Sequence, residues 1–270
     1  MDKTWMSELE GIILDMDGVL WKGSQPLVDL PVLFTLIEER GWKVLGMTNN
    51  STRTPTYYLS KLESFGVELE NWQVINSSET TAYYLKEKFP QGGGVYMIGE
   101  RGLRTALKDQ GFYLIEDGGQ REPMAVVAGM DRNLTYKKIE KAARFIRGGT
   151  PFLGTNPDKT YPTPEGLAPG AGVVLAAIEA ASGVQPMVMG KPQQRMYRVA
   201  FDRLSCSPEK TLVVGDRLET DILGAQNAGC HSALVLSGVT SKEDLRNWTQ
   251  APDLVGDDVL TLFTSLFHDE

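Results

Sequence analysis

The chain has 270 residues, 41% of them hydrophobic, which is enough for one large domain or two smaller ones with real cores. Its formal net charge of −8 and its pI near 5.0 argue against nucleic acid as the main partner, because binding along a phosphate backbone requires a basic surface. No stretch approaches the roughly 20 apolar residues of a membrane span, and the N-terminus lacks the apolar core of a signal peptide, so we expect no membrane partner. Cys206 and Cys230 lie in no zinc-like cluster, which predicts free thiols in a cytoplasmic protein.

The first predicted element is a buried strand at residues 11–14, an apolar run typical of a parallel sheet. It ends at Asp15 and Asp17, and side chains two residues apart on an extended segment point the same way, so the two carboxylates should lie together. Two neighbouring negative charges repel unless a cation intervenes, and hard oxygen ligands favour Mg²⁺. Taken alone, however, such a pair is more typical of a solvated loop.

A second strand is predicted at residues 44–47, after a helix at 30–40, and it also ends in polar residues. Thr48, Asn49 and Asn50 follow it, and Pro55 then begins another helix. A hydroxyl and amides at a strand end before a helix N-terminus suit a phosphate oxygen, which needs neutral donors and a favourable dipole. The same residues are equally typical of ordinary helix N-capping.

A second, smaller α/β domain is predicted to begin near a glycine linker at residues 92–94, after a helix at 80–88. Two of its strand ends carry polar groups, one with Asp131, Arg132 and Asn133, and the other with Asp158. The proline- and glycine-rich segment after Asp158 is predicted to be a stiff loop facing a ligand or solvent. The expected strands and helices alternate: strands at 95–98, 125–128 and 151–153, and helices at 103–110, 136–147 and 173–181.

The first domain is then predicted to resume with two further apolar strands that end in charged residues. Residues 187–189 lead to Lys191, and residues 212–215 lead to Asp216, with Asp221 on the first turn of the next helix. Because all carboxyl ends of a parallel sheet lie on one edge, we expect these groups to converge with Asp15 and Asp17 in one crevice. That convergence favours a reaction site over a solvated loop. Strands at 231–236 and 254–256 and a helix at 257–267 complete the domain.

Four motifs resemble the haloacid dehalogenase superfamily: DMDGV at 15–19, TNN at 48–50, GKP at 190–192 and GDRLETD at 215–221. Two more, GMDRNLTY at 129–136 and TNPD…PTPEG…PGAG within 155–172, resemble its type IIA branch, the NagD-like and 4-nitrophenylphosphatase-like enzymes. This resemblance implies an α/β fold with a Rossmann-like, doubly wound parallel-sheet core at 1–77 and 186–270 and an inserted α/β cap of the C2 type at 78–185. It also suggests a homodimer formed through the cap.

The resemblance implies Mg²⁺-dependent hydrolysis of small phosphate monoesters through an aspartyl-phosphate intermediate. Asp15 resembles the nucleophile. Asp17 resembles the general acid that protonates the leaving oxygen and then deprotonates water, and it contacts the metal through its backbone carbonyl, which leaves its side chain free for proton transfer. Lys191 neutralises the phosphoryl oxygens and Thr48 donates to them.

The remaining site residues also follow from the motifs. Asp216 resembles a metal ligand, and Asp221 a residue that orients the metal ligands rather than touching Mg²⁺. Substrate-binding positions are expected at Thr48, Asn49, Asn50, Lys191 and, in the cap, Arg132, Asn133 and Asp158. Arg132 is equally expected to lie exposed to solvent.

Other activities use the same residues. A phosphomutase or phosphotransferase would pass the phosphoryl group to a sugar hydroxyl instead of water, and an assay of released phosphate separates these reactions. Dehalogenation is disfavoured by Asp17, and a non-catalytic phospholigand-binding module by the complete set of catalytic residues. The substrate is expected to be a small phosphorylated metabolite, and nucleotides, phosphoglycolate, pyridoxal phosphate and sugar phosphates all remain open.

Overall fold

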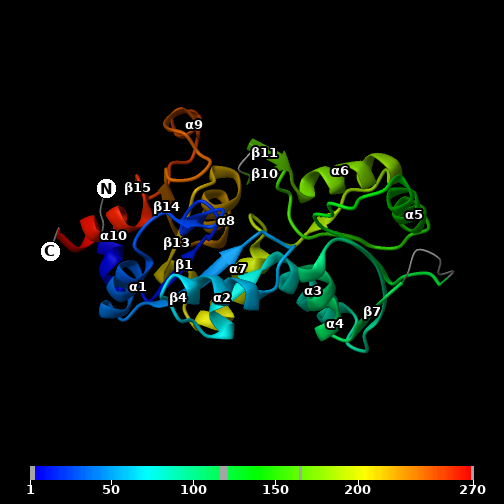
Figure 1. Ribbon diagram of the computed structural model, residues 1–270, viewed down its shortest axis with the longest axis horizontal. Coiled ribbons are helices and arrows are strands. Elements are labelled where there is room, and N and C mark those ends of the chain that lie inside the picture. Colours follow the sequence, from blue (N-terminus) through cyan, green and yellow to red (C-terminus); the bar gives the residue numbers. More distant parts are fainter. Residues whose placement is uncertain (1–3, 116–120, 164–165, 269–270) are drawn as a thin grey trace. The chain divides into compact units, whose positions relative to one another are not determined.

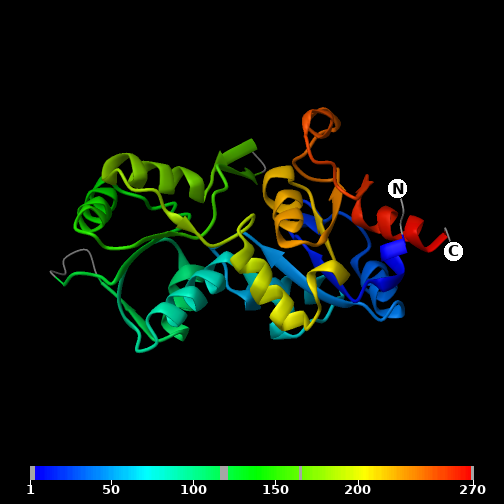
Figure 2. The ribbon, with the colours of Figure 1, turned by 180° about the vertical axis from the view of Figure 1, so that it is seen from behind.

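The computed structural model describes residues 4–115, 121–163 and 166–268 (Figures 1 and 2). It separates into two compact units. The first comprises Met1–Thr48, Thr56–Ile75 and Lys191–Glu270, and the second comprises Asn49–Pro55 and Asn76–Gly190. Two residues of the PTPEG motif, Pro164 and Glu165, lie outside the described residues. Within the described ranges, no helix is long and apolar enough to cross a membrane.

The first unit is built on a six-stranded sheet with β1 at its centre. β1 pairs in parallel with β4 on one side and β13 on the other, so that Ile12 lies opposite both Val44 and Leu212. The parallel pairing continues from β13 to β14 and β15. The strands lie in the order β15 (Leu254–Gly256), β14 (His231–Val235), β13 (Thr211–Gly215), β1 (Gly11–Leu14), β4 (Lys43–Thr48) and β5 (Val74–Asn76).

Helices cover both faces of this sheet because β1 is apolar on both faces. Ile12 and Leu14 belong to the core shared with α1, α2 and α10, whereas Ile13 packs in the core shared with α7. This doubly wound α/β arrangement confirms the predicted fold class of the first unit. The helices are α1 (Leu30–Glu39), α2 (Pro55–Ser64), α7 (Gln194–Leu204), α8 (Leu223–Ala228), α9 (Lys242–Asn247) and α10 (Val259–His268).

Local sequence explains where α1 begins and ends. The Asp29 side chain accepts a hydrogen bond from the backbone N–H of Val32, as an N-cap residue does, and a proline occupies the first turn. Leu30, Leu33 and Ile37 recur at helical spacing and are all buried. Gly41, just past the helix, has a φ of 69°, a left-handed conformation that suits glycine. The helix predicted at residues 30–40 is therefore confirmed.

The second unit is a smaller α/β layer with a five-stranded parallel sheet. Apolar side chains of α5 and α6 pack on one face, with Tyr96 and Val126 of the sheet, and those of α3 and α4 pack on the other, with Val95 and Val127. Figures 1 and 2 both show α5 beside α6 and α3 beside α4. The strands are β12 (Met187–Val188), β9 (Phe152–Gly154), β8 (Ala125–Ala128), β6 (Gly93–Ile98) and β7 (Phe112–Leu114), and the helices are α3 (Ser77–Lys88), α4 (Arg101–Asp109), α5 (Tyr136–Arg147) and α6 (Ala171–Ser182).

The strand before Lys191 was predicted to join the sheet of the first domain, and this prediction is wrong. β12 pairs instead with β9 in the second unit, with Met187 opposite Leu153 and Val188 opposite Gly154. Both places beside β1 are occupied by β4 and β13, and a two-residue strand with Met187 45% exposed suits an edge. Lys191 therefore follows a strand of the second unit and is itself the first residue of the resumed first unit.

The segment after Asp158 also differs from the prediction of a loop. It contains an antiparallel hairpin of β10 (Thr160–Thr163) and β11 (Gly166–Pro169). Prolines are tolerated here because both strands of a two-stranded ribbon are edges. A second hairpin, β2 (Trp21–Lys22) with β3 (Gln25–Pro26), follows the Asp15 segment, where no strand was predicted. The edge strands β5 and β7 and the helices α7 and α9 were not predicted.

Candidate active site

Asp15 follows the last residue of β1, and its carboxylate is paired with Lys191. The backbone N–H of Asp15 still donates to the carbonyl oxygen of Val214 at 2.9 Å, which holds it in line with the sheet. Lys191 Nζ lies 2.5 Å from Asp15 Oδ1 and 2.6 Å from Asp221 Oδ1, and it donates to the Met47 carbonyl oxygen at 3.2 Å. Its side chain is only 3% exposed. A buried ammonium group thus bridges two carboxylates from distant parts of the chain.

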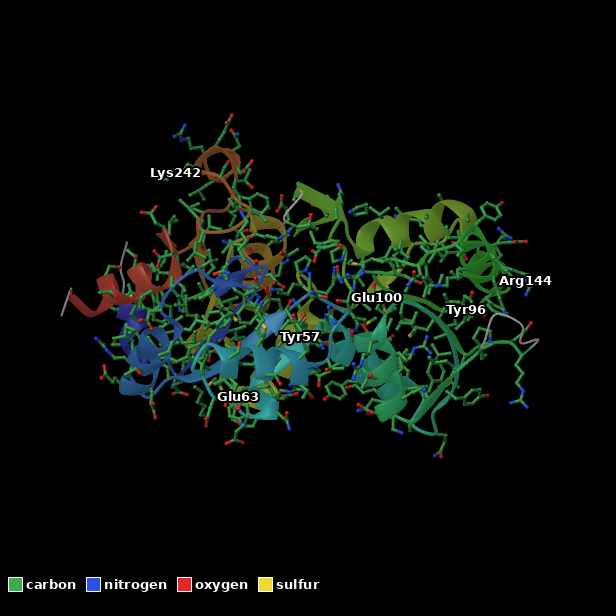
Figure 3. All side chains as sticks on the ribbon, in the orientation of Figure 1. Tyr57, Glu63, Tyr96, Glu100, Arg144 and Lys242 are labelled. Carbon is green, nitrogen blue, oxygen red and sulfur yellow. The ribbon has the colours of Figure 1, made fainter. Side chains whose placement is uncertain are left out.

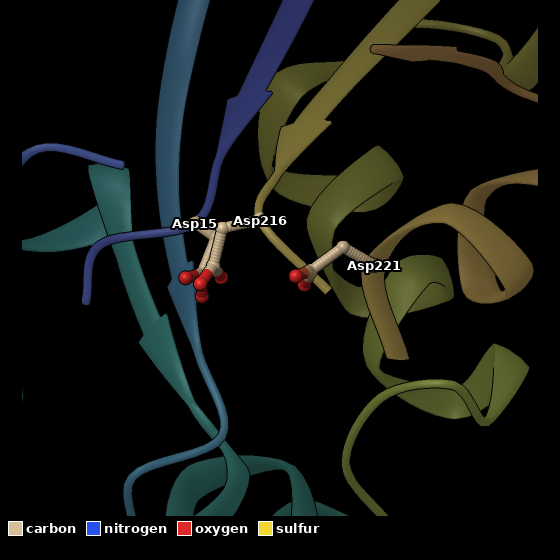
Figure 4. Close-up of side chains that lie close together, drawn as sticks. All are labelled: Asp15, Asp216 and Asp221. Atoms are coloured by element: carbon tan, nitrogen blue, oxygen red, sulfur yellow. The ribbon is translucent and has the colours of Figure 1, made fainter. Parts of the chain in front are cut away.

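Asp216 and Asp221 complete a cluster of three carboxylates with Asp15. One carboxylate oxygen from each lies within 4.8 Å of the others, and Figure 4 shows the three side chains directed into one space. Asp216 follows β13, and its Oδ2 accepts the backbone N–H of Val239 at 2.7 Å. Asp221 lies in a π-helical turn, Leu218–Ile222, and its Oδ2 accepts the backbone N–H of Arg217 at 3.1 Å. Such turns are frequent at functional sites.

Two glycines leave room for the Asp216 carboxylate. A Cβ added at Gly238 would lie 1.9 Å from Asp216 Oδ2, and one added at Gly18 would lie 2.4 Å from the same oxygen. Gly18 also has a φ of 97°, which side chains other than glycine rarely adopt. The backbone on both sides of Asp216 can therefore approach its oxygens closely only because these residues lack a side chain.

The pKa values of the cluster reflect burial first and crowded negative charge second. Burial raises the pKa of Asp15 well above its usual range, and although Lys191 lowers it, the neighbouring Asp221 and Asp216 raise it further. Burial and the charge of Asp221 raise the pKa of Asp216 to about 7. Burial lowers the pKa of Lys191, but Asp15 and Asp221 outweigh burial and raise it above its usual value. The ammonium group is therefore firmly charged, and it is one cation against three carboxyl groups.

These residues fit a divalent cation with oxygen ligands. Asp216 Oδ1 is buried and has no hydrogen-bond partner among the described residues, and burying a polar atom without a partner is costly. The cluster offers hard carboxylate oxygens from Asp15, Asp216 and Asp221, the donors that Mg²⁺ prefers. A cation at this position would satisfy the orphaned oxygen and relieve the repulsion that raises the two pKa values.

Asp17, two residues after Asp15, belongs to a different set of contacts. Its Oδ1 accepts a hydrogen bond from Trp21 Nε1 at 2.9 Å. Burial raises the pKa of Asp17, and Lys61 and the Trp21 bond oppose that shift. Lys61 itself lies with Nζ 3.9 Å from the centroid of the Trp21 ring, and burial lowers its pKa to about 8. The Asp17 side chain is therefore engaged by the hairpin that follows it rather than by the carboxylate cluster.

Thr48 is the last residue of β4 and is buried, so it ends the strand beside β1 as predicted. The two asparagines after it belong to the second unit. Asn49 Nδ2 donates to Asp158 Oδ1 at 3.2 Å. Asn50 Oδ1 accepts the backbone N–H and the hydroxyl of Thr52, at 3.0 and 2.7 Å, an Asx turn of the kind that precedes helices. The structure thus brings Asn49 together with Asp158.

Arg132 forms a two-pronged ion pair with Glu100. Its Nε and Nη2 lie 2.7 and 2.5 Å from the two Glu100 carboxylate oxygens, and its backbone N–H donates to the same carboxylate at 3.2 Å. Glu100, labelled in Figure 3, immediately precedes α4. The Arg132 side chain is 55% exposed, in keeping with the expected exposure to solvent. Asn133 is also exposed, and its backbone N–H donates to Asp131 Oδ1 at 2.9 Å.

Several residues that shape the site were not identified from the sequence. Trp21 and Lys61 surround Asp17, and the backbone N–H of Val239 holds Asp216. Trp21 lies only four residues after Asp17, and a large aromatic residue next to a predicted reaction site was the available signal. The backbone N–H donor of Val239 could not be recognised from the sequence, because every residue except proline has a backbone N–H group.

Two protein-family profiles match the chain, one described as haloacid dehalogenase-like hydrolase over residues 12–113 and one described as HAD-hydrolase-like over residues 188–262. The 5'-nucleotidase YutF of Bacillus subtilis is 34% identical over 247 residues, which are 92% of this chain and 94% of that protein. An acid sugar phosphatase of Staphylococcus aureus is 32% identical, with the same two coverages. The crystal structure of a 4-nitrophenylphosphatase from Thermotoga maritima has a TM-score of 0.89 and 32% identity, over 96% of this chain and 98% of that chain.

Proposed function

We propose that this chain hydrolyses small phosphate monoesters through an aspartyl phosphate formed on Asp15. The chain belongs to the haloacid dehalogenase-like hydrolases and is a phosphatase of their type IIA branch. The observation that carries this proposal is the buried ammonium group of Lys191 between Asp15 and Asp221. A lysine in this position lowers the pKa of Asp15, which favours the ionised form that attacks, and it faces the phosphoryl oxygens with a positive charge. Both effects act where negative charge develops during phosphoryl transfer.

In the first step, a carboxylate oxygen of Asp15 forms a bond to phosphorus. The bond between phosphorus and the leaving oxygen breaks, and that oxygen takes a proton from Asp17. The Thr48 hydroxyl and Lys191 hold the phosphoryl oxygens in place during this transfer. Splitting hydrolysis into two displacements replaces one difficult reaction by two easier ones.

In the second step, a water molecule attacks phosphorus, and the proton that it loses goes to Asp17. The bond between phosphorus and Asp15 breaks, which releases inorganic phosphate and restores the carboxylate. Asp17 therefore ends each cycle with the proton that it gave up in the first step.

We propose Mg²⁺ as the cofactor, held by the carboxylates of Asp15 and Asp216 and by the backbone carbonyl of Asp17, with Asp221 orienting these ligands. When bound, the ion would supply positive charge next to the phosphoryl group. The support for this assignment is the cluster of oxygen donors and the unpartnered Asp216 Oδ1.

We also propose that the second unit selects the ester that is accepted. Every residue assigned to phosphoryl transfer and to the metal lies in the first unit. The second unit would therefore act on the reaction by contacting the leaving group and by controlling the access of water. Relatives named as a 5'-nucleotidase and as an acid sugar phosphatase make nucleoside monophosphates and sugar phosphates the first esters to compare.

The decisive experiment measures released inorganic phosphate and the covalent intermediate with 4-nitrophenyl phosphate. Asp15→Asn should abolish the phosphoenzyme, because no carboxylate remains to attack. Asp17→Asn should impair both steps and above all the breakdown of the intermediate, so that the phosphoenzyme accumulates. An undiminished burst of 4-nitrophenol from Asp15→Asn would place the nucleophile elsewhere. Release of the leaving group without free phosphate, when a sugar hydroxyl is supplied as acceptor, would instead indicate a phosphotransferase.

A further inference from the structure

The indole of Trp21 is the only side chain that an observed hydrogen bond joins to Asp17 within the described residues. Trp21 Nε1 lies 2.9 Å from Asp17 Oδ1, the usual length of an N–H···O bond. The bond closes within one short loop, where the backbone N–H of Gly18 also donates to the Trp21 carbonyl oxygen at 2.8 Å. Asp17 and Trp21 are thus joined both through the backbone and through their side chains.

The chemistry of an indole limits what this bond can do. Its N–H is a donor only and carries no lone pair available for accepting a hydrogen bond. In a protonated carboxyl group the carbonyl oxygen accepts a hydrogen bond better than the hydroxyl oxygen does, so the Trp21 bond favours Oδ1 as the unprotonated oxygen. A proton carried by Asp17 is then favoured on Oδ2, the oxygen that would exchange it with a substrate or with water.

The ring of Trp21 is held firmly enough for this purpose. It is fully buried and lies parallel to the Tyr58 ring, with centroids 6.4 Å apart, and near Phe65, at 6.2 Å. The ammonium group of Lys61 covers its face and donates to the Gly23 carbonyl oxygen at 2.7 Å. Tyr58 and Lys61 of α2, together with Phe65 just after that helix, thus fix the plane of the indole and the hairpin that carries it.

We propose that Trp21 is a positioning residue that presents Oδ2 of Asp17, and not Oδ1, for proton transfer in the reaction. This inference rests on the proposed function, because it assigns to Asp17 the transfer of a proton to the leaving oxygen. Losing the bond would leave the carboxyl group free to rotate and to carry its proton on either oxygen. Loss of the bond should lower kcat/KM most for esters whose leaving oxygen requires protonation.

The test compares kcat/KM for two esters that differ in this requirement. An alkyl phosphate such as glycerol 2-phosphate has a leaving oxygen that needs a proton, whereas 4-nitrophenolate leaves readily without one. Trp21→Phe should lower kcat/KM for the alkyl ester by about tenfold or more, the scale of one hydrogen bond to a charged group, and should change the nitrophenyl ester by no more than about twofold. A purely structural role for Trp21 would lower both values by the same factor.

Two controls keep the result interpretable. Trp42→Phe makes the same chemical change at a tryptophan that packs in the same core, against Phe263, and should leave the ratio of the two kcat/KM values unchanged. If Trp21→Phe does not fold, benzothienylalanine at position 21 retains the shape of the ring and replaces the N–H by sulfur, and the same loss is expected from it.

The outcomes separate this inference from the proposed function. If the wild-type protein forms no phosphoenzyme, or if Asp15→Asn retains activity, the proposed function fails. Suppose instead that the wild-type protein forms the phosphoenzyme, that Asp15→Asn is inactive and that Asp17→Asn discriminates between the esters. If neither Trp21 variant then changes the ratio of the two kcat/KM values, the assignment of Trp21 is overturned.

Discussion

Replacement of Lys191 by methionine tests whether the buried ammonium group holds the site together. Lys191→Met keeps much of the side-chain length but leaves Asp15 and Asp221 facing each other without the charge that lies 2.5 and 2.6 Å from them. Removing one partner of a buried ion pair typically costs about 3–5 kcal/mol. A domain of ordinary stability has only about 5–15 kcal/mol, so the urea midpoint of unfolding should fall markedly in the presence of EDTA.

The matched control is Lys210→Met. Lys210 Nζ also lies 2.6 Å from a carboxylate, that of Glu10, but both side chains are roughly half exposed, at 41% and 48%. The same substitution at the same distance should therefore hardly move the midpoint, because exposed ion pairs contribute little. Added Mg²⁺ should stabilise Lys191→Met more than the wild type, since a cation can replace the missing charge. Equal midpoints for the two variants in EDTA would refute the reasoning.

Three further predictions concern the metal and the choice of substrate. Phosphate release should vanish with a chelator and return with Mg²⁺ but not with Ca²⁺, because the looser geometry of Ca²⁺ would let Asp15 chelate it with both oxygens. Full activity in excess EDTA would contradict the metal assignment. Gly238→Ala should raise the Mg²⁺ concentration for half-maximal activity, because its Cβ would lie 1.9 Å from Asp216 Oδ2, whereas Gly148→Ala, whose Cβ meets nothing closer than 3.2 Å, should not. Arg132→Ala or Asn133→Ala should change the ratios of kcat/KM among phosphorylated metabolites by about tenfold or more, with a smaller effect on 4-nitrophenyl phosphate. A uniform fall in kcat/KM for every ester would assign these residues to catalysis or folding.

The positions of Asp15, Thr48 and Asp216 could be predicted because they depend on local pattern. Each follows or ends a short apolar run, and those runs form β1, β4 and β13, three neighbouring parallel strands. Lys191 shows where this reasoning stops. Its preceding residues have the same apolar pattern, yet β12 pairs with β9 in the other unit. An apolar pattern can indicate that a strand forms. The strand with which it pairs depends on which sheet has a free edge, and the pattern does not identify that sheet.

The contacts of Asp17 and Asp216 could not be predicted for a related reason. The loop after β1 is held from far along the chain, because the Ser237 hydroxyl donates to the carbonyl oxygen of Gly18 at 2.7 Å across 219 positions. The same distant segment supplies the Val239 N–H that binds Asp216. The two aspartates therefore share one supporting loop, although we propose one for proton transfer and the other for metal binding. A substitution that displaces residues 237–239 should disturb both functions together, whereas Trp21→Phe should disturb proton transfer alone, because Trp21 binds Asp17 and makes no observed hydrogen bond to Asp216 within the described residues.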